Sequence, residues 1–250
     1  GPRWVVSRGR PCLPPFLPER PLACFLRGLD ADPTCAMAHW GIAYAAGPNY
    51  NMPWERRDAK MRAATAETCH SATLAALKHV KNVTPFERAM IEALPSRFPQ
   101  GRPESLDVMR GWNDDLADAM RTVCQGFPGD LGVACIFVEA IMNRTPWKMW
   151  DQATGDFAEG AGTKEAQDVL EQMFDQQEEA RAHPGLLHLY VHLMEMSPTP
   201  EKAPKAGAAL RDLVPDTGHQ SGQPTHTGDT GSSLNKTSTS DERRSVSTGS

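Results

Sequence analysis

The chain has 250 residues, with 26 Lys and Arg against 31 Asp and Glu and a formal net charge of −5 at pH 7. A chain of this length can bury a substantial core, and its lack of a basic cluster argues against nucleic-acid and anionic-membrane binding. The longest apolar run, residues 131–138, is far too short to span a bilayer. Six cysteines without C-x-x-C spacing and no secretion signal predict reduced thiols in an intracellular, cytoplasmic protein.

Proline dominates the start of the chain. Residues 1–20 contain five prolines and no sustained periodicity, so we predict a disordered leader. Apolar residues at helical spacing then predict helices over about 22–31 and 37–46, the second ended by a Gly-Pro pair. Asn51 is the predicted N-cap of a third helix, which we expect to run to about residue 79.

A capping box marks the next helix. Thr84 is followed by Pro85 and Glu87, so a helix should begin at the proline and end near residue 94. Helical spacing, caps and Pro or Gly breaks predict the later helices in the same way. We expect them at residues 104–125, 130–142, 164–182, 184–195 and about 200–214.

No alternating run of β-branched residues bounded by turns occurs, so the predicted fold class is all-α. From Thr217 onward Ser, Thr and Gly dominate, and such a segment buries too little apolar surface to offset its ordering entropy. We therefore divide the chain into a Pro-rich leader (1–20), a helical repeat domain (21–216) and a disordered Ser/Thr/Gly-rich tail (217–250).

Helix pairs joined by short turns indicate a right-handed α-solenoid of helical hairpins. Residues 24–44 resemble the second helix of one tetratricopeptide repeat and the first helix of the next. In this resemblance Phe25 takes the repeat's aromatic position and Pro33 its closing proline. Pro204 fits the second helix of the last pair poorly unless that helix starts late.

Three longer motifs are similar to a family of fungal and bacterial tetratricopeptide-repeat-domain proteins. They read C-A-M-A-H-W-G-I-A-Y-A-A-G-P-N-Y-N (35–51), H-P-G-L-L-H-L-Y-V-H-L-M-E-M-S (183–197) and L-V-P-D-T-G-H (213–219). The resemblance covers roughly residues 21–219 and implies a fold far more than a chemistry, because the family's function is not well established. In the family the final Gly-His pair is followed by another histidine and an M-P-x-H segment. Here Gly222 stands at the histidine position and His226 ends the remnant, so we expect a shortened chain with an unpaired last repeat.

Residues 183–195 hold the strongest candidate site. His188 and His192 are four apart and Glu195 is three further on, which places all three on one helical face, with His183 just before the helix. One hypothesis is that they bind a transition metal such as zinc or iron. Leu189 occupies the slot of the general-base glutamate in H-E-x-x-H, so the segment is not that type of protease motif. The further candidate ligands, brought in by folding, are His39, His183, His219 and His226.

The alternative is that these histidines are interior residues, hydrogen-bonded to carbonyls and to Glu195. Two other groups of residues could likewise either belong to a functional site or have a structural role. Glu139 and Asn143 share a helical face, and we interpret them as a structural or solvated pair. Trp112, Trp147 and Trp150 either line a groove or pack the core, and packing is the expected role.

The sequence leaves the function open between two classes. By fold analogy, the first hypothesis is an intracellular scaffold whose concave surface takes a protein or peptide. The alternative is a metal-dependent enzyme, a hydrolase or an oxidoreductase, that uses the His/Glu cluster inside the solenoid; a chain without activity is a third possibility. The enzyme hypothesis would be favoured over the scaffold if folding brought four histidines into one cavity: His39, His188, His192 and His219.

Overall fold

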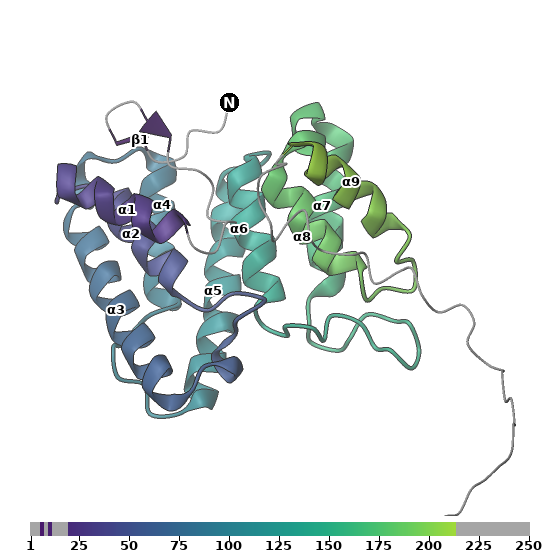
Figure 1. Ribbon diagram of the computed structural model, residues 1–250, viewed down its shortest axis with the longest axis horizontal. Coiled ribbons are helices and arrows are strands. Elements are labelled where there is room, and N and C mark those ends of the chain that lie inside the picture. Colours follow the sequence, from purple (N-terminus) through teal and green to yellow (C-terminus); the bar gives the residue numbers. More distant parts are fainter. Residues whose placement is uncertain (1–5, 8–9, 12–19, 214–250) are drawn as a thin grey trace, which may run out of the picture.

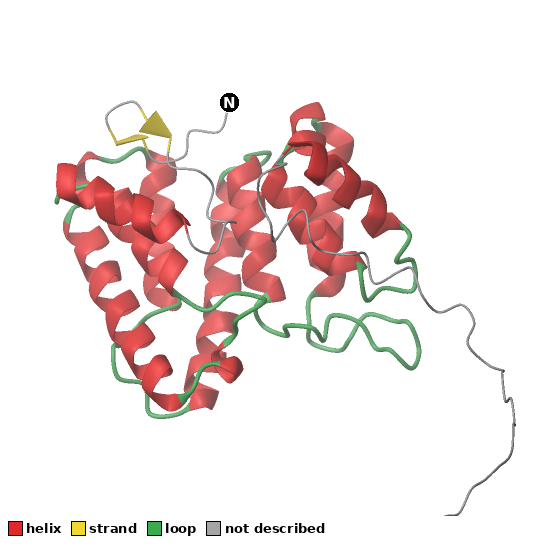
Figure 2. Ribbon diagram, in the orientation of Figure 1, coloured by secondary structure: helices red, strands yellow, loops and turns green. Residues whose placement is uncertain are grey.

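The computed structural model describes residues 6–7, 10–11 and 20–213, and the described part consists of helices joined by loops, with one short strand pair and one isolated β-bridge (Figures 1 and 2). The predicted all-α class is confirmed. The helices are α1 (Arg20–Ala31), α2 (Ala36–Ala46), α3 (Ala59–Lys78), α4 (Pro85–Ala93), α5 (Leu106–Gly126), α6 (Leu131–Met142), α7 (Thr163–Gln176), α8 (Pro184–Met194) and α9 (Lys202–Leu213). Short 3₁₀ turns lie at Trp54–Arg56, Val80–Asn82, Leu94–Ser96 and Glu178–Ala182.

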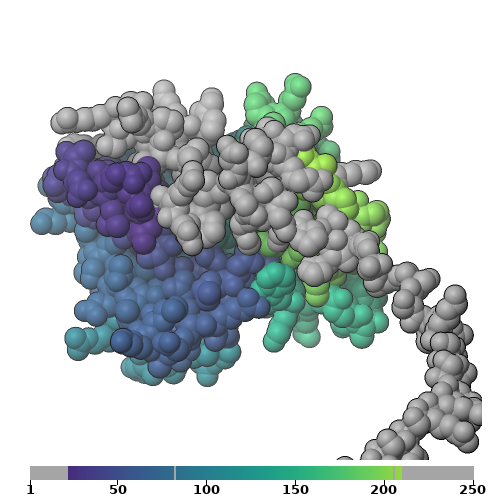
Figure 3. Space-filling view, viewed as in Figure 1, coloured from purple at the N-terminus to yellow at the C-terminus, as the bar shows by residue number. Residues whose placement is uncertain are grey.

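Most helices pack against their neighbours in the chain. Helix α1 packs on α2, α2 on α3, α5 on α6, α6 on α7 and α8 on α9, while α6 also contacts α8. Figure 1 shows α1–α4 on one side, α5 and α6 in the middle and α7–α9 on the other side. Figure 3 shows the same two flanks in a space-filling view, one purple and blue and the other green and yellow.

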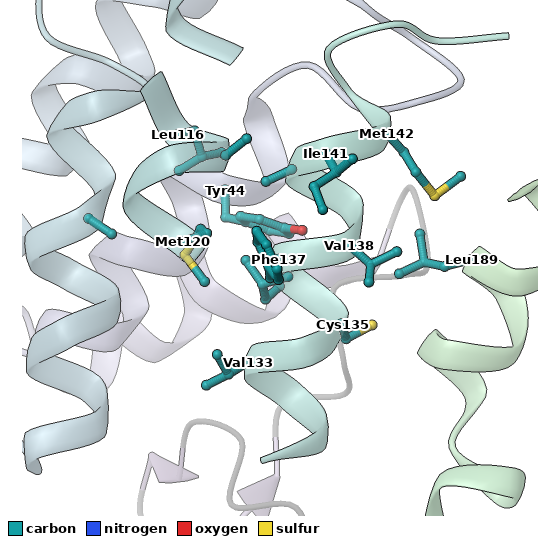
Figure 4. Packing of buried hydrophobic residues seen from close by; sticks show 14 of the residues in the cluster. Tyr44, Leu116, Met120, Val133, Cys135, Phe137, Val138, Ile141, Met142 and Leu189 are labelled. Carbon is teal, nitrogen blue, oxygen red and sulfur yellow. The ribbon is translucent and has the colours of Figure 1, made fainter. Parts of the chain in front are cut away.

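Helix α6 is the centre of the core. Every residue from Gly132 to Met142 is buried, so the helix is surrounded by protein on all sides. Figure 4 shows its side chains meeting Leu116 and Met120 of α5 on one side and Leu189 of α8 on the other. One continuous apolar cluster therefore extends from Phe25 to Ala203.

Local capping signals place two helix starts where we predicted them. In the capping box, the backbone N–H of Thr84 donates to Glu87 at 2.8 Å and the N–H of Glu87 donates to the Thr84 hydroxyl at 3.3 Å. The Asp130 carboxylate caps α6 by accepting from the backbone N–H groups of Gly132 and Val133 at 2.9 and 3.0 Å. Both caps satisfy amides that have no partner within the helix.

Two predicted boundaries are wrong. Helix α3 is capped by Asp58, which accepts from Met61 N–H at 2.7 Å, and not by Asn51. The Asn49 side chain instead closes a turn by accepting from two backbone N–H groups, at 2.9 and 3.1 Å. The helix predicted over 164–182 ends at Gln176, where Gln177 is extended and a short 3₁₀ turn follows; the side-chain amide of Gln177 donates to the carbonyl of Gly129 at 2.8 Å.

Part of the predicted N-terminal leader is described by the structure, whereas the predicted C-terminal tail is not. In the predicted leader, β1 (Val6–Ser7) pairs antiparallel with β2 (Arg10–Pro11). Helix α9 begins at Lys202, so Pro204 lies in its first turn, where a missing N–H costs little. The predicted tail, with His219 and His226, lies outside the described residues. Within residues 20–213, no helix is both long and apolar enough to cross a membrane.

Candidate functional site

The candidate site is built on α8, and its first histidine serves as a cap. His183 Nδ1 accepts from the backbone N–H of Leu186 at 3.2 Å, while Pro184 occupies the first helical position. Burial lowers the pKa of His183, and the nearby Asp130 carboxylate opposes this shift. A neutral imidazole is also what the cap requires, because a protonated ring has no lone pair to accept with. His183 therefore has a structural role in starting the helix.

The structure places His188 and His192 side by side on α8, with Glu195 at its C-terminal cap beside His192. The two imidazole rings lie 4.6 Å apart between centroids and are nearly perpendicular, at 88°. His192 is 1% exposed, and its Nδ1 lies 3.0 Å from a Glu195 carboxylate oxygen. A carboxylate only accepts hydrogen bonds, so Nδ1 carries the proton in this pair.

Nε2 is the nitrogen of His192 that is not used in the contact with Glu195. With Nδ1 protonated, Nε2 of the neutral ring presents its lone pair. This atom is buried and has no hydrogen-bond partner among residues 20–213. A carboxylate that fixes the tautomer and orientation of a histidine in this way is the usual partner of a metal-bound or proton-transferring imidazole.

Two aromatic residues from other segments complete the cluster around His192. The ring of Tyr50, in the loop before α3, lies 4.9 Å from the rings of both Trp147 and His192. Trp147, in the turn after α6, lies 6.0 Å from His192 and has a left-handed backbone with φ of 62°. Burial raises the pKa of Tyr50, and the charge of Glu195 raises it further, against a smaller opposing effect of the Trp147 main chain.

The sequence alone does not assign these two residues to a site. For Trp147 we predicted packing in the core, and for Tyr50 no role in a site. The sequence around them, G-P-N-Y-N and T-P-W, is typical of turns, and a turn pattern does not identify a contact partner 142 or 45 residues away. Only the folded chain shows the contact with α8.

Among the described residues, the remaining predicted ligands His39 and His183 are not part of this cluster. A ring nitrogen of His39 lies 2.9 Å from the carbonyl oxygen of Pro33, and its ring stacks on His79 at 5.8 Å. His183 is engaged as the cap of α8, and His219 and His226 lie outside the described residues. Across the described part of the chain, no group of three or more His, Cys, Asp or Glu side chains is arranged to hold a metal. The metal hypothesis stays a prediction.

A second buried polar group lies on α6. Glu139 is 8% exposed, and one of its carboxylate oxygens accepts a short hydrogen bond from the Tyr44 hydroxyl of α2. Burial raises the pKa of Glu139 to about 7, while the Asn143 side chain opposes the rise. The Asn113 amide donates to the carbonyl of Asn143 at 3.0 Å. Glu139 and Asn143 are therefore buried parts of a polar network between α2, α5 and α6, and not a solvated pair.

Arg97 extends this network. It is 1% exposed, donates to the carbonyl of Pro48, and lies over the rings of Tyr44 and Phe98 at 5.3 and 5.4 Å. Burial lowers the pKa of Arg97 to about 10, and the charge of Arg57 acts in the same direction. The guanidinium is stabilised mainly by ring faces and a carbonyl.

These observations define an all-α protein with a buried histidine–glutamate pair flanked by two aromatic rings. Comparison of the chain with protein-family models, with curated proteins and with solved structures gives no match. The tetratricopeptide resemblance accordingly rests on the sequence motifs alone.

Proposed function

We propose that the chain is a tetratricopeptide-like scaffold that binds a protein or peptide. The packing order of the helices is the observation that supports this most directly, because α1, α2 and α3, then α5, α6 and α7, each pack on the next helix in the chain. Stacks of this kind are held by contacts between neighbours and form curved surfaces that take extended partners. In this proposal the hairpins stack in a right-handed sense and the partner lies along the concave face.

Selection of peptides from a random library against the full chain tests the scaffold. We expect peptides that bind saturably and whose affinity falls when one exposed apolar side chain is replaced by aspartate. Leu26 on α1, Leu74 on α3 and Met196 after α8 are 49%, 54% and 37% exposed, so Asp variants at these positions sample three exposed parts of the chain. Because a few residues carry most of the energy of an interface, loss should be confined to one surface. Peptides that bind all three variants and the unfolded chain equally would contradict the proposal.

A second candidate is a metal-dependent enzyme, either a hydrolase or an oxidoreductase. It is supported by the pairing of His192 with Glu195, which leaves Nε2 buried beside the ring of His188. In this candidate His188 and His192 bind zinc or iron, Glu195 orients His192, and histidines from the C-terminal segment complete the ligand set.

Elemental analysis of the purified full chain tests the metal. We expect near-stoichiometric zinc or iron in the wild type and little in a His188→Ala/His192→Ala variant. His39→Ala is the matched control, because His39 is bound to Pro33 and stacked on His79 and should not affect the metal content. A metal-free wild type that also takes up no added zinc or iron would remove this candidate.

A further inference from the structure

The start of α8 depends on a side chain that titrates near neutral pH. In α8 the N-cap is a ring nitrogen, because Nδ1 of His183 accepts from the backbone N–H of Leu186 at 3.2 Å. Four other helices, α3, α4, α5 and α6, are capped by side-chain oxygens of Asp58, Thr84, Ser105 and Asp130. Within this set, the imidazole is the cap whose charge changes between about pH 5 and 8.

Protonation of His183 is incompatible with the cap. A proton on Nδ1 occupies the lone pair that accepts from Leu186, so the ring then presents a donor to another donor. The added positive charge also lies at the N-terminus of α8, where the helix dipole disfavours a cation. His183 is 6% exposed, so water has little access to the position that the ring occupies. A charged His183 must therefore leave the cap position.

The elements packed against α8 determine which charges act on His183. Helix α8 packs on α6, α7, α9 and the 3₁₀ turn before it. Asp130, at the start of α6, opposes the lowering of the His183 pKa by burial, as does the main chain of His183 itself. On α7 and α9, Glu171 and Lys202 are paired with each other at 3.4 Å. The charged residues of the turn are exposed: Glu178, Glu179 and Arg181.

Asp130 offers a charged His183 a second partner. Its Oδ1 caps α6 by accepting from the N–H groups of Gly132 and Val133 at 2.9 and 3.0 Å. A carboxylate has two oxygens, so an imidazolium can donate to Oδ2 while the α6 cap stays in place. The ring thus has one arrangement for each charge state, on Leu186 when neutral and on Asp130 when protonated.

We propose that His183 is a pH-operated cap, which closes the first turn of α8 when neutral and turns to Asp130 when protonated, so that the turn opens. Acid pH thereby loosens the start of the helix that carries His188 and His192. The inference goes beyond both proposed functions and does not depend on which of them is correct.

The cap gives stability a defined dependence on pH. Burial holds the pKa of His183 in the folded protein below its ordinary value of 6.5. Just below pH 6.5 the unfolded chain therefore binds more protons at this residue than the folded protein does. The contribution of His183 to the free energy of unfolding is complete above pH 6.5 and falls as the pH drops toward the pKa of the folded state.

Nuclear magnetic resonance of the full chain between about pH 7.5 and 5 tests the cap. The His183 ring resonances are identified by their loss in His183→Asn and His183→Ser, two variants that supply a cap oxygen without a charge that changes in this range. The backbone N–H of Leu186 reports on the cap itself. The N–H of Val108 is the internal control, because it is capped at 3.2 Å by the hydroxyl of Ser105, which does not titrate.

We expect the Leu186 amide to shift with the same midpoint as the His183 ring, below pH 6.5, while the Val108 amide stays in place. In both His183 variants the Leu186 amide should not move over this range. Asp130→Asn keeps an oxygen for the α6 cap and removes the charge, so it should move the His183 midpoint to lower pH.

Urea unfolding at several pH values gives a second readout. Over the same range the unfolding equilibrium constant of the wild type should rise roughly fivefold relative to His183→Asn, as expected for the loss of one N-cap. Carboxyl titrations are common to both proteins and cancel in this comparison.

Three results would overturn the proposal. One is a His183 ring that titrates while the Leu186 amide stays in place, and another is a ring that stays neutral down to pH 5. The third is an Asp130→Asn variant with an unchanged His183 midpoint, which would remove Asp130 as the partner of the charged ring.

Discussion

At the scale of single residues, the least ordinary group is the Glu139 carboxyl. It lies on the central helix α6, is 8% exposed and accepts a hydrogen bond from Tyr44. Burial disfavours its charged form and raises its pKa from 4.5 to about 7. The folded protein therefore holds this proton over a pH range in which the unfolded chain releases it.

This difference predicts a pH dependence of stability. Below pH 4.5 the carboxyl is protonated in both states and costs nothing. Between pH 4.5 and 7 the unfolded chain binds fewer protons than the folded protein, so the free energy of unfolding falls as pH rises. The total fall is roughly 3 kcal/mol at one pKa unit per 1.36 kcal/mol, and it ends above pH 7.

Glu139→Gln removes this titration while keeping the shape of the side chain. We expect the variant to gain stability relative to the wild type as pH rises from 4.5 to 7, measured by urea unfolding at several pH values. Glu159→Gln is the control, because Glu159 is exposed and should leave the pH profile unchanged. Parallel wild-type and Glu139→Gln profiles over this range would show that the Glu139 pKa is not raised in the folded state.

At the scale of elements, the sequence predicts those helix boundaries that are set by contacts between residues close together in the chain. The capping box at Thr84 and the Asp130 cap involve residues two or three apart, so spacing alone places them. The third helix was misplaced because Asn51 and Asp58 are both good N-caps in sequence, and the Asn49 turn decides between them. At the end of α7 the extended Gln177 donates from its side chain to the carbonyl of Gly129, a contact between distant residues that no local pattern contains.

The same distinction holds for the candidate site. His188, His192 and Glu195 were predicted to share a face because helical spacing fixes their relation. Tyr50 and Trp147 were missed because their contact with His192 depends on how two loops meet α8. The interior alternative already named Glu195 as a hydrogen-bond partner of these histidines, and the structure shows that His192 is paired with it.

At the scale of the whole molecule, the central position of α6 affects how the chain unfolds. In an open solenoid each hairpin contacts only its neighbours, and one end can melt before the other. Here α6 is buried along its length, contacts α5, α7 and α8, and belongs to one apolar cluster from Phe25 to Ala203. A continuous core of this kind favours a single cooperative transition.

Substitutions near the two ends of this core should therefore have the same kind of effect. Met90 on α4 and Leu186 on α8 are 1% and 0% exposed, and truncating either to alanine should lower the free energy of unfolding by about 2–5 kcal/mol. We expect urea unfolding followed by far-UV circular dichroism and by tryptophan fluorescence to shift together in both variants. Leu74→Ala, at a residue 54% exposed, should leave the midpoint unchanged. If Leu186→Ala instead splits the transition, so that α7–α9 melt before α1–α4, the stack is held by neighbour contacts and α6 does not couple its two sides.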